Sequence, residues 1–384
     1  MKAQAGELFR FRFLTEVRFG RGVRSKVGDY LAELQAQKAV LLCDENAVTT
    51  SPARELIGII ENALEVLVLN GPKGEPEISG LEALRKEARD FEADIVIGLG
   101  GGSTLDTAKG LAAVMPNSKP AAEYQGFDKL EKPALPSVLI PTLFGAGTEV
   151  TASAVMINRE KKVKGGINGR YVFPRMAVID PELGAGAPPH VMGATALDAL
   201  VHSIEGYVAR CSTVLSRMYS KQAALLLLPA LFKLANNPSS VDALEDVSLG
   251  ALLAVTGLMH SESGLCGAIS YPLGVHHGVP HGLGGGLPLP RAILFNAENG
   301  CSLYSDLIAG TFSPLHAAQK LSDDIRELIK AFDLPPLSQF GMDSEQAAII
   351  AREVFGFKAV LDMNPVKIDS PDIIRDTICS ALER

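Results

Sequence analysis

A carboxylate and an imidazole four residues apart are the clearest candidates for metal chemistry in this sequence. Asp198 and His202 lie in the stretch 194–210, which is predicted to form a long helix. Residues at this spacing project from the same helix face, so the two side chains point in one direction. Together they can bind a divalent cation such as Zn²⁺ or Fe²⁺. An isolated pair of this kind is more often a surface or capping interaction, so a metal site needs further ligands.

A glycine-rich turn is the second candidate, and its chemistry would be phosphate binding. The apolar run 94–99 leads directly into the sequence GGGS at 100–103, and a helix is predicted to begin near Thr104. Glycines let the backbone approach a ligand closely, and the start of a helix offers free N–H groups to a pyrophosphate. Asp106 lies in the first turns of this helix. Taken alone, the turn is equally compatible with a structural connection.

An acidic residue earlier in the chain complements this turn. Asp44 directly follows the apolar run 40–43. A carboxylate there can accept hydrogen bonds from the adenosine ribose hydroxyls and would repel a 2′-phosphate, which favours NAD over NADP. The usual dinucleotide-binding fingerprint has the glycines first and the acid later, so the order here is reversed. A further segment at 141–151 has two glycines and three threonines after a predicted strand, which suits a loop around a polar ligand.

The elements that must position these residues change in type along the chain. In the first half, apolar runs alternate with helical stretches, which predicts a largely parallel sheet covered on both faces. The predicted strands are 39–43, 65–69, 94–99, 137–140 and 176–179, with helices at 80–91 and 104–115. After Pro188 and Pro189, the predicted elements are the helices 194–210, 216–235, 241–261, 315–332, 344–355 and 372–382. We therefore predict a Rossmann-like α/β domain at 1–188 and an all-helical domain at 189–384, with a glycine-rich segment at 278–286.

Composition excludes several classes of function. The net charge of −8 argues against non-specific nucleic-acid binding, because a polyanion would be repelled. The start of the chain is interrupted by charges and lacks a secretory segment, and no apolar run is long enough to cross a membrane. The five cysteines are scattered without CxxC spacing, which argues against a disulfide framework. We therefore expect a cytoplasmic protein that acts on a small molecule.

Four segments together resemble the iron-containing (group III) alcohol dehydrogenase family, which is related to glycerol dehydrogenase and 3-dehydroquinate synthase. They are 100–109 (GGGSTLDTAK), 141–151 (PTLFGAGTEVT), 198–208 (DALVHSIEGYV) and 272–282 (PLGVHHGVPHG). They follow the order of the family, and the resemblance covers nearly the whole chain. It implies an N-terminal domain that binds NAD(P), a helical C-terminal domain and a metal-centred site in the cleft between them.

The resemblance also implies roles for individual residues on the cofactor side. The glycine-rich turn would hold the pyrophosphate, the segment 141–151 would line the path of the adenine and nicotinamide, and a lysine would lie near the nicotinamide ribose. Together with Asp44, the implied cofactor-binding residues are Gly101, Gly102, Ser103, Asp106, Thr142, Leu143, Thr148 and Lys164. Without the resemblance, the lysine run 161–164 would be predicted to be a solvated hairpin.

On the metal side, the resemblance adds a third ligand and two departures. His281 matches a family ligand, so Asp198, His202 and His281 are the implied ligands for Fe or Zn. Gly267 stands where the family has a further histidine ligand, and glycine has no side chain to donate. Tyr271 stands where the family often has a second histidine that is thought to assist proton transfer.

Three interpretations of this centre remain open. In the first, the three ligands leave an open position for substrate, as catalytic zinc sites commonly do. In the second, a fourth ligand comes from Cys266, His260, His276 or His277. In the third, no metal binds, and His202 and His281 make hydrogen bonds to the substrate.

The predicted function is interconversion of an alcohol and an aldehyde or ketone by hydride transfer, assisted by the metal ion. Tyr271 and His277 are the candidates for proton exchange with solvent. The alternatives are a dehydroquinate synthase-like lyase that uses NAD transiently, a metal-free divergent dehydrogenase, and a homologue that binds nucleotide without turnover. Family members are often dimers or larger, so a homo-oligomer is expected.

Overall fold

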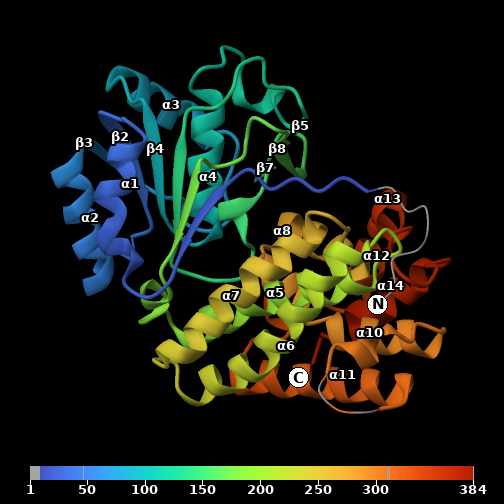
Figure 1. Ribbon diagram of the computed structural model, residues 1–384. Helices are drawn as coiled ribbons and strands as arrows, with labels where there is room; N and C mark the ends of the chain where they lie inside the picture. Colours follow the sequence, from blue (N-terminus) through green and yellow to red (C-terminus); the bar gives the residue numbers. More distant parts are fainter. Residues whose placement is uncertain (1–8, 46, 309, 311, 384) are drawn as a thin grey trace. The chain divides into compact units, whose positions relative to one another are not determined.

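A computed structural model of the chain describes residues 9–45, 47–308, 310 and 312–383. It divides into two compact units (Figure 1). The α/β unit comprises residues 13–187. The helical unit comprises the segment from residue 188 onward together with residues 9–12.

The α/β unit is built on a six-stranded sheet in which every pairing is parallel. In spatial order its strands are β1 (Glu16–Phe19), β9 (Met176–Ile179), β6 (Ser137–Pro141), β4 (Ile95–Gly100), β2 (Lys38–Cys43) and β3 (Glu65–Asn70). The five predicted strands are all present, and β1 is an additional edge strand. The predicted fold class, a parallel Rossmann-like sheet followed by a helical region, is confirmed.

Helices cover both faces of this sheet, and the alternation of side chains along the strands explains why. On β2, Val40 and Leu42 pack in a core with α3 (Gly80–Asp90) and α4 (Gly102–Val114). The intervening residues of β2 pack on the other face with α1 (Val27–Glu33) and α2 (Ser51–Ala63). Successive strand residues point to opposite faces of the sheet. Because helices cover both faces, both sets of residues are apolar, and the strand is a continuous apolar run in the sequence.

A second, smaller sheet lies in the same unit. It consists of β5 (Gly126–Phe127), β8 (Val163–Asn168) and β7 (Ser153–Asn158). β7 and β8 form an antiparallel hairpin that contains the lysine run, and β5 pairs with β8 in parallel. Lys164 is therefore a strand residue, and its position is fixed by the pairing of Ile157 with Lys164.

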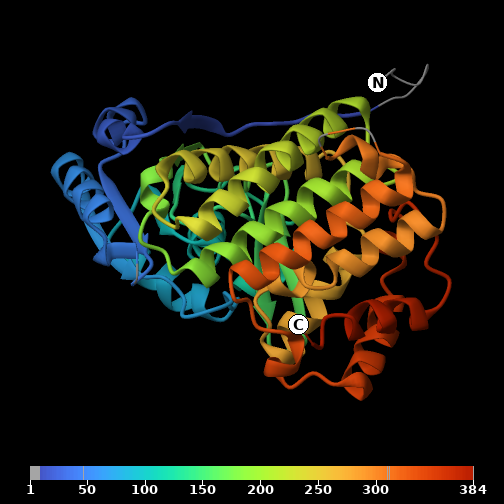
Figure 2. The ribbon, with the colours of Figure 1, turned by 90° about the horizontal axis from the view of Figure 1, so that it is seen from below.

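The helical unit contains no strand among its described residues. Its helices are α5 (Pro189–Val208), α6 (Val214–Asn236), α7 (Val241–Leu258), α8 (Leu265–His277), α9 (His281–Gly286), α10 (Leu289–Glu298), α11 (Pro314–Ala331), α12 (Ser344–Phe355), α13 (Lys358–Leu361) and α14 (Pro371–Cys379). The long helices α5, α6 and α7 pack side by side (Figure 2). Phe11, from the N-terminal segment, stacks on the rings of Tyr219 and His260 and so attaches this segment to the helical unit.

The glycine-rich segment forms a helix, which its composition did not predict. Glycine is a poor helix former, but α9 packs so closely on its neighbours that side chains would not fit. A Cβ on Gly282 would overlap the carbonyl oxygen of Ala194, and one on Gly286 would lie 2.8 Å from the Cβ of Leu197. Both contacts are with α5, so the glycines bring the backbone of α9 directly onto that helix.

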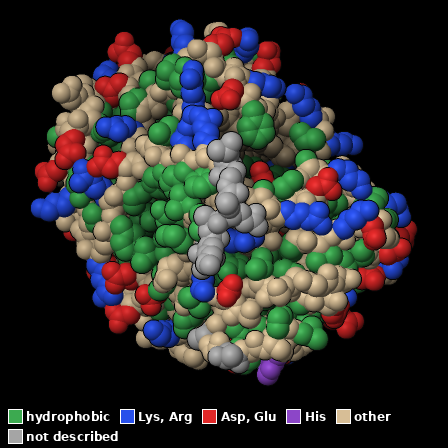
Figure 3. Space-filling view, turned by 45° about the vertical axis from the view of Figure 1, so that its right-hand side comes forward, with side chains coloured by type: hydrophobic (Ala, Val, Ile, Leu, Met, Phe, Trp, Pro, Cys, Tyr) green, Lys and Arg blue, Asp and Glu red, His purple; other side chains and the backbone are tan. Residues whose placement is uncertain are grey.

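Charge on the surface is mixed. Basic and acidic side chains are both spread over the face drawn in Figure 3, and the sequence contains 36 basic and 44 acidic residues. None of the described helices combines the length and the apolar character needed to cross a membrane.

Candidate functional site

Three predicted metal ligands come together in the helical unit. Asp198 and His202 lie one turn apart on α5, and His281 is the first residue of α9. Oδ1 of Asp198 is 3.5 Å from Nε2 of His202 and 3.9 Å from Nε2 of His281. One ligand atom from each of the three lies within 4.8 Å of the others, and no other group of this kind occurs among the described residues.

The chemistry of this group fits a divalent metal ion. A carboxylate and two imidazoles are ligands that zinc and iron both accept. Ligand atoms at about 2.0–2.2 Å from a tetrahedral metal lie about 3.3–3.6 Å apart. The separation of Asp198 from His202 lies in this range, and that of Asp198 from His281 is slightly longer. The side chains of Asp198, His202 and His281 are only 7, 12 and 28% exposed. Nδ1 of His202 is buried without a hydrogen-bond partner among the described residues.

Gly267 leaves no room for a fourth ligand at its position. A Cβ there would overlap the side chain of Ser263, whose hydroxyl donates a hydrogen bond to Glu205 at 2.7 Å. The same carboxylate accepts hydrogen bonds from the backbone N–H groups of Gly264, Cys266 and Gly267, so it caps the start of α8. A histidine at position 267 would therefore also require Ser263 to move or be replaced.

The other candidates around this centre are placed as follows. The ring of Tyr271 meets that of His281 edge to face, with centroids 5.4 Å apart and an angle of 86°. His277, the last residue of α8, is half-buried and is not part of the three-residue group.

The possible fourth ligands have other environments. His276 is paired with Glu353 at 2.9 Å, and His260 makes hydrogen bonds to backbone atoms of Arg12 and Thr256. Cys266 is fully buried, and burial raises the pKa of its thiol well above the ordinary value, which disfavours the thiolate that a metal would need. Two of the four candidates thus have other partners, and burial disfavours the thiolate of a third.

Three of the predicted cofactor residues lie at one edge of the parallel sheet. Asp44, Gly101 and Thr142 each follow the carboxyl end of one of the neighbouring strands β2, β4 and β6. Backbone hydrogen bonds fix them: the N–H of Asp44 donates to Leu99, and that of Thr142 donates to Gly100, both at 3.0 Å. In open α/β sheets, ligands bind outside the carboxyl ends of the strands.

The glycines at this edge provide space and backbone freedom. Gly100 has a φ of 156°, and a Cβ on it would lie 2.8 Å from that of Asp44. Gly101 is the N-cap of α4 and Gly102 its first residue, so Gly102, Ser103 and the residues after them carry the free N–H groups of the helix start. These groups favour an anion such as a pyrophosphate.

The segment between β6 and β7 lies directly against this helix start. A Cβ on Gly101 would lie 3.0 Å from the side chain of Leu143, and one on Gly102 would lie 3.6 Å from Ala146. Thr148 donates a short hydrogen bond from its hydroxyl to Asp106. Burial raises the pKa of Asp106, and the nearby Lys109 opposes that shift. Lys164 forms an ion pair with Glu75 at 2.7 Å.

Glu149 was not among the predicted site residues, yet it is buried in the same segment. It belongs to the short 3₁₀ helix Thr148–Val150 and is only 5% exposed. Burial raises the pKa of its carboxyl to about 7, although Lys109 stabilises the ionised form. The only sign of this burial in the sequence is that the same segment contains the apolar residues Phe144 and Val150, which are also buried.

Replacing Glu149 by glutamine should make stability depend less on pH. The carboxyl has a pKa of about 7 in the folded protein and 4.5 ordinarily, so the folded state retains a proton that the unfolded chain releases. The contribution of this carboxyl to the free energy of unfolding is therefore complete below pH 4.5. It is lost as pH rises from 4.5 through 7, by up to about 3 kcal/mol. Since glutamine cannot ionise, E149Q should gain stability relative to the parent between pH 5 and pH 8 in urea unfolding.

A suitable control is Glu123→Gln, because Glu123 is an exposed acid in another short 3₁₀ helix of the same unit. Its stability difference from the parent should be the same at both pH values. An E149Q difference that also stays constant with pH would contradict the prediction.

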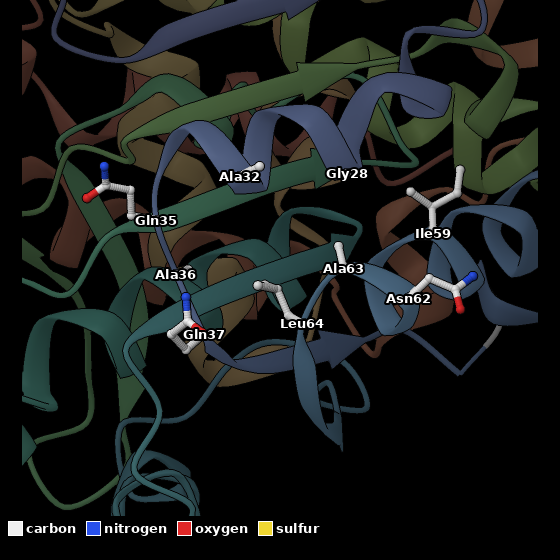
Figure 4. Close-up of a pocket in the computed structure, with 9 residues that line it drawn as sticks. All are labelled: Gly28, Ala32, Gln35, Ala36, Gln37, Ile59, Asn62, Ala63 and Leu64. Carbon is white, nitrogen blue, oxygen red and sulfur yellow. The ribbon is translucent and has the colours of Figure 1, made fainter.

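A surface hollow of about 610 Å³ lies elsewhere in the α/β unit (Figure 4). It is bordered by Gly28 and Ala32 of α1, by Ile59 and Asn62 of α2, and by Gln37, which precedes β2. It is thus located at the amino ends of the strands, whereas the cofactor residues follow their carboxyl ends. The hollow is therefore not part of the candidate site.

Comparison with known proteins supplies the observation that decides the family. The family model described as iron-containing alcohol dehydrogenase matches residues 15–181, and the model for the C-terminal part of the same family matches residues 192–381. The chain belongs to the iron-containing alcohol dehydrogenase family. The predicted family membership is thereby confirmed.

Curated relatives and a solved structure of this family extend along almost the full chain. Sulfoacetaldehyde reductase of Bilophila wadsworthia is 28% identical over 381 residues, which is 95% of each protein. NAD-dependent methanol dehydrogenase of Bacillus methanolicus is 29% identical over 351 residues, covering 88% of this chain and 90% of the relative. The crystal structure of sulfoacetaldehyde reductase from Bifidobacterium kashiwanohense in complex with NAD⁺ matches with a TM-score of 0.87 and 25% identity, covering 98% of this chain and 99% of the other.

As an iron-containing alcohol dehydrogenase, the protein is an oxidoreductase that interconverts alcohols with aldehydes or ketones. This confirms the predicted enzyme class and favours it over a dehydroquinate synthase-like lyase. The family name and the group Asp198, His202 and His281 agree with the predicted divalent metal, and the NAD⁺ complex of the relative agrees with the predicted cofactor.

Proposed function

We propose that this protein is an NAD-dependent dehydrogenase of small alcohols and aldehydes whose metal ion is held by Asp198, His202 and His281. The observation that carries the proposal is the convergence of these three side chains from two helices. When bound, a Zn²⁺ or Fe²⁺ ion would supply Lewis acidity to a substrate oxygen. Three protein ligands are the usual number for a catalytic zinc site with an open position.

Neighbouring residues would hold and orient this centre. The edge-to-face contact with Tyr271 restricts rotation of the His281 ring. Tyr271 also brings a phenol hydroxyl into this region, which could carry a proton between substrate and solvent, and half-buried His277 is a second candidate for the same role. Glu205 holds the start of α8, the helix that carries both residues.

The cofactor would be bound in the α/β unit. The N–H groups at the start of α4, from Gly102 onward, would bind the pyrophosphate with Ser103, and Asp44 would accept hydrogen bonds from the adenosine ribose. We assign Thr142, Leu143 and Thr148 to the path of the cofactor. The carboxylate of Asp44 favours NAD over NADP because it would repel a 2′-phosphate.

Assembly and location are part of the proposal. Cys43, Cys211, Cys266, Cys301 and Cys379 are all free thiols, which is typical of a reducing compartment such as the cytoplasm. The protein is further proposed to be a homo-oligomer, and its mass in solution would measure this directly.

The proposal predicts a metal-dependent enzyme that prefers NADH. Purified protein should contain about one Zn or Fe per chain by elemental analysis, the stoichiometry of a three-ligand site. Oxidation of NADH with a panel of small aldehydes should stop after chelation and resume when Zn²⁺ or Fe²⁺ is restored. NADPH should be the poorer reductant in the same assay.

Two outcomes would count against separate parts of the proposal. Turnover that is insensitive to chelation in protein without metal would remove the metal from the mechanism and leave Tyr271 and the histidines to polarise the carbonyl. Binding of NADH without turnover on any aldehyde of the panel would favour a nucleotide-binding homologue.

A further inference from the structure

The ammonium group of Lys109 is enclosed by oxygen atoms. Lys109 lies on α4, and its side chain is 0% exposed. Its Nζ is 2.6 Å from the carbonyl oxygen and 3.0 Å from the hydroxyl of Thr148, and 2.8 Å from the hydroxyl of Thr151. It also donates a short hydrogen bond to the carbonyl of Ser153 and is 3.4 Å from Oδ1 of Asp106.

The carbonyl and carboxylate oxygens of this cluster can only accept hydrogen bonds, so the ammonium supplies donors that they need. The two threonine hydroxyls can both donate and accept, and buried polar atoms without a partner are costly. An ammonium has three N–H donors and no acceptor, so it satisfies such a cluster as a bound cation would. Burial lowers the pKa of Lys109, while Asp106 beside it opposes the change.

The cluster joins two parts of the proposed cofactor site. Thr148, Thr151 and Ser153 lie in the segment that leads from β6 into β7, and Asp106 lies on α4 with Lys109. The start of α4 carries the N–H groups proposed to bind the pyrophosphate. Thr142, Leu143 and Thr148, which are proposed to line the cofactor path, lie in the same segment as the oxygen atoms around Lys109. The ammonium thus links the two parts by hydrogen bonds.

We propose that Lys109 is a positioning residue for the cofactor: its ammonium fastens residues 148–153 to α4 and so preforms the site for the dinucleotide. Being fully buried, it acts through Thr148 and its neighbours. The inference rests on the proposed binding of NAD at this edge of the sheet. The sequence predicted that the segment 141–151, which includes Thr151, lines the cofactor path, but it assigned no separate role to Lys109.

The test is chemical rescue of NADH binding. Lys109→Ala removes the atoms of n-propylammonium and leaves the oxygen cluster in place. NADH binding, measured by fluorescence titration, should weaken about tenfold or more, the equivalent of one charged hydrogen bond. Added n-propylammonium should restore most of this affinity, whereas tetramethylammonium, which has no N–H donor, should not. In steady-state assays KM for NADH should rise more than kcat falls.

A milder pair of variants keeps the test decisive if Lys109→Ala does not fold, as judged by circular dichroism. Thr151→Val removes the hydroxyl at 2.8 Å from Nζ, and Thr151→Ser retains it. Thr151→Val should weaken NADH binding about threefold to tenfold, as expected for one hydrogen bond, and Thr151→Ser should bind like the parent. Parent-like affinity in Thr151→Val and in any folded Lys109→Ala would overturn the inference, as would rescue by both cations. Failure of the parent itself to bind NADH would instead overturn the proposed cofactor site.

Discussion

Replacing His202 by alanine is expected to remove the metal and most of the activity. The substitution leaves one carboxylate and one imidazole, too few to hold a divalent ion in a partly open site. A metal that polarises a carbonyl contributes several kcal/mol to the transition state, so kcat/KM should fall by about 10²–10⁴-fold. Elemental analysis after dialysis and aldehyde-dependent NADH oxidation measure the two effects independently.

His190→Ala provides the matched control. His190 is also on α5 but is exposed in its first turn, so its loss should change neither metal content nor rate. NADH affinity of the His202 variant should equal that of the parent, because the cofactor residues lie in the α/β unit. Parent-like metal content and kcat/KM in His202→Ala would refute the assignment of this residue as a ligand.

Placing a branched side chain at Gly102 is expected to impair cofactor binding without unfolding the protein. A Cβ on this glycine has only ordinary contact with Ala146, at 3.6 Å, so the fold should accept valine. The side chain would however stand over the free N–H groups at the start of α4 and keep a pyrophosphate away. Hydrogen bonds to a charged group contribute about 1.5–3 kcal/mol, so the Kd for NADH should rise about 10- to 100-fold.

Gly80→Val is the corresponding control because Gly80 is the first residue of α3 and a Cβ there meets nothing within 4 Å. Its NADH affinity should equal that of the parent, and the unfolding temperatures of both variants should be similar. If Gly102→Val bound NADH as tightly as Gly80→Val, the pyrophosphate would have to bind elsewhere.

Much of the fold follows from patterns that are local in sequence. The central strands β2, β4 and β6 are buried on both faces, so apart from Lys38 and Ser137 at their starts they are apolar runs. The lysine run 161–164 indicated a hairpin, but the strands β7 and β8 that form it were not predicted. The hairpin contains Gly165 and Gly166 and charged lysines, and its pairing is specified by contacts with the rest of the unit.

The candidate site also combines features that are local in sequence with features that depend on distant contacts. The spacing of Asp198 and His202 places them on one helix face, which is a local property. His281 could be associated with them only through the family resemblance, because its approach depends on how α9 packs against α5. The burial of Lys109 and Glu149 was not predicted, because burial of a charged group depends on partners distant in the sequence.

The glycines of α9 have a consequence for the entropy of folding. Each glycine in a helix costs roughly 0.5–1 kcal/mol relative to alanine, because the unfolded chain has more freedom to lose. Gly282, Gly284, Gly285 and Gly286 make up most of this six-residue helix. His281 is thus presented by an element with little helical preference of its own, which is held in shape by α5 and α8. Mutations that loosen those two helices should therefore disturb the third ligand before they unfold the protein, even where they lie far from any ligand.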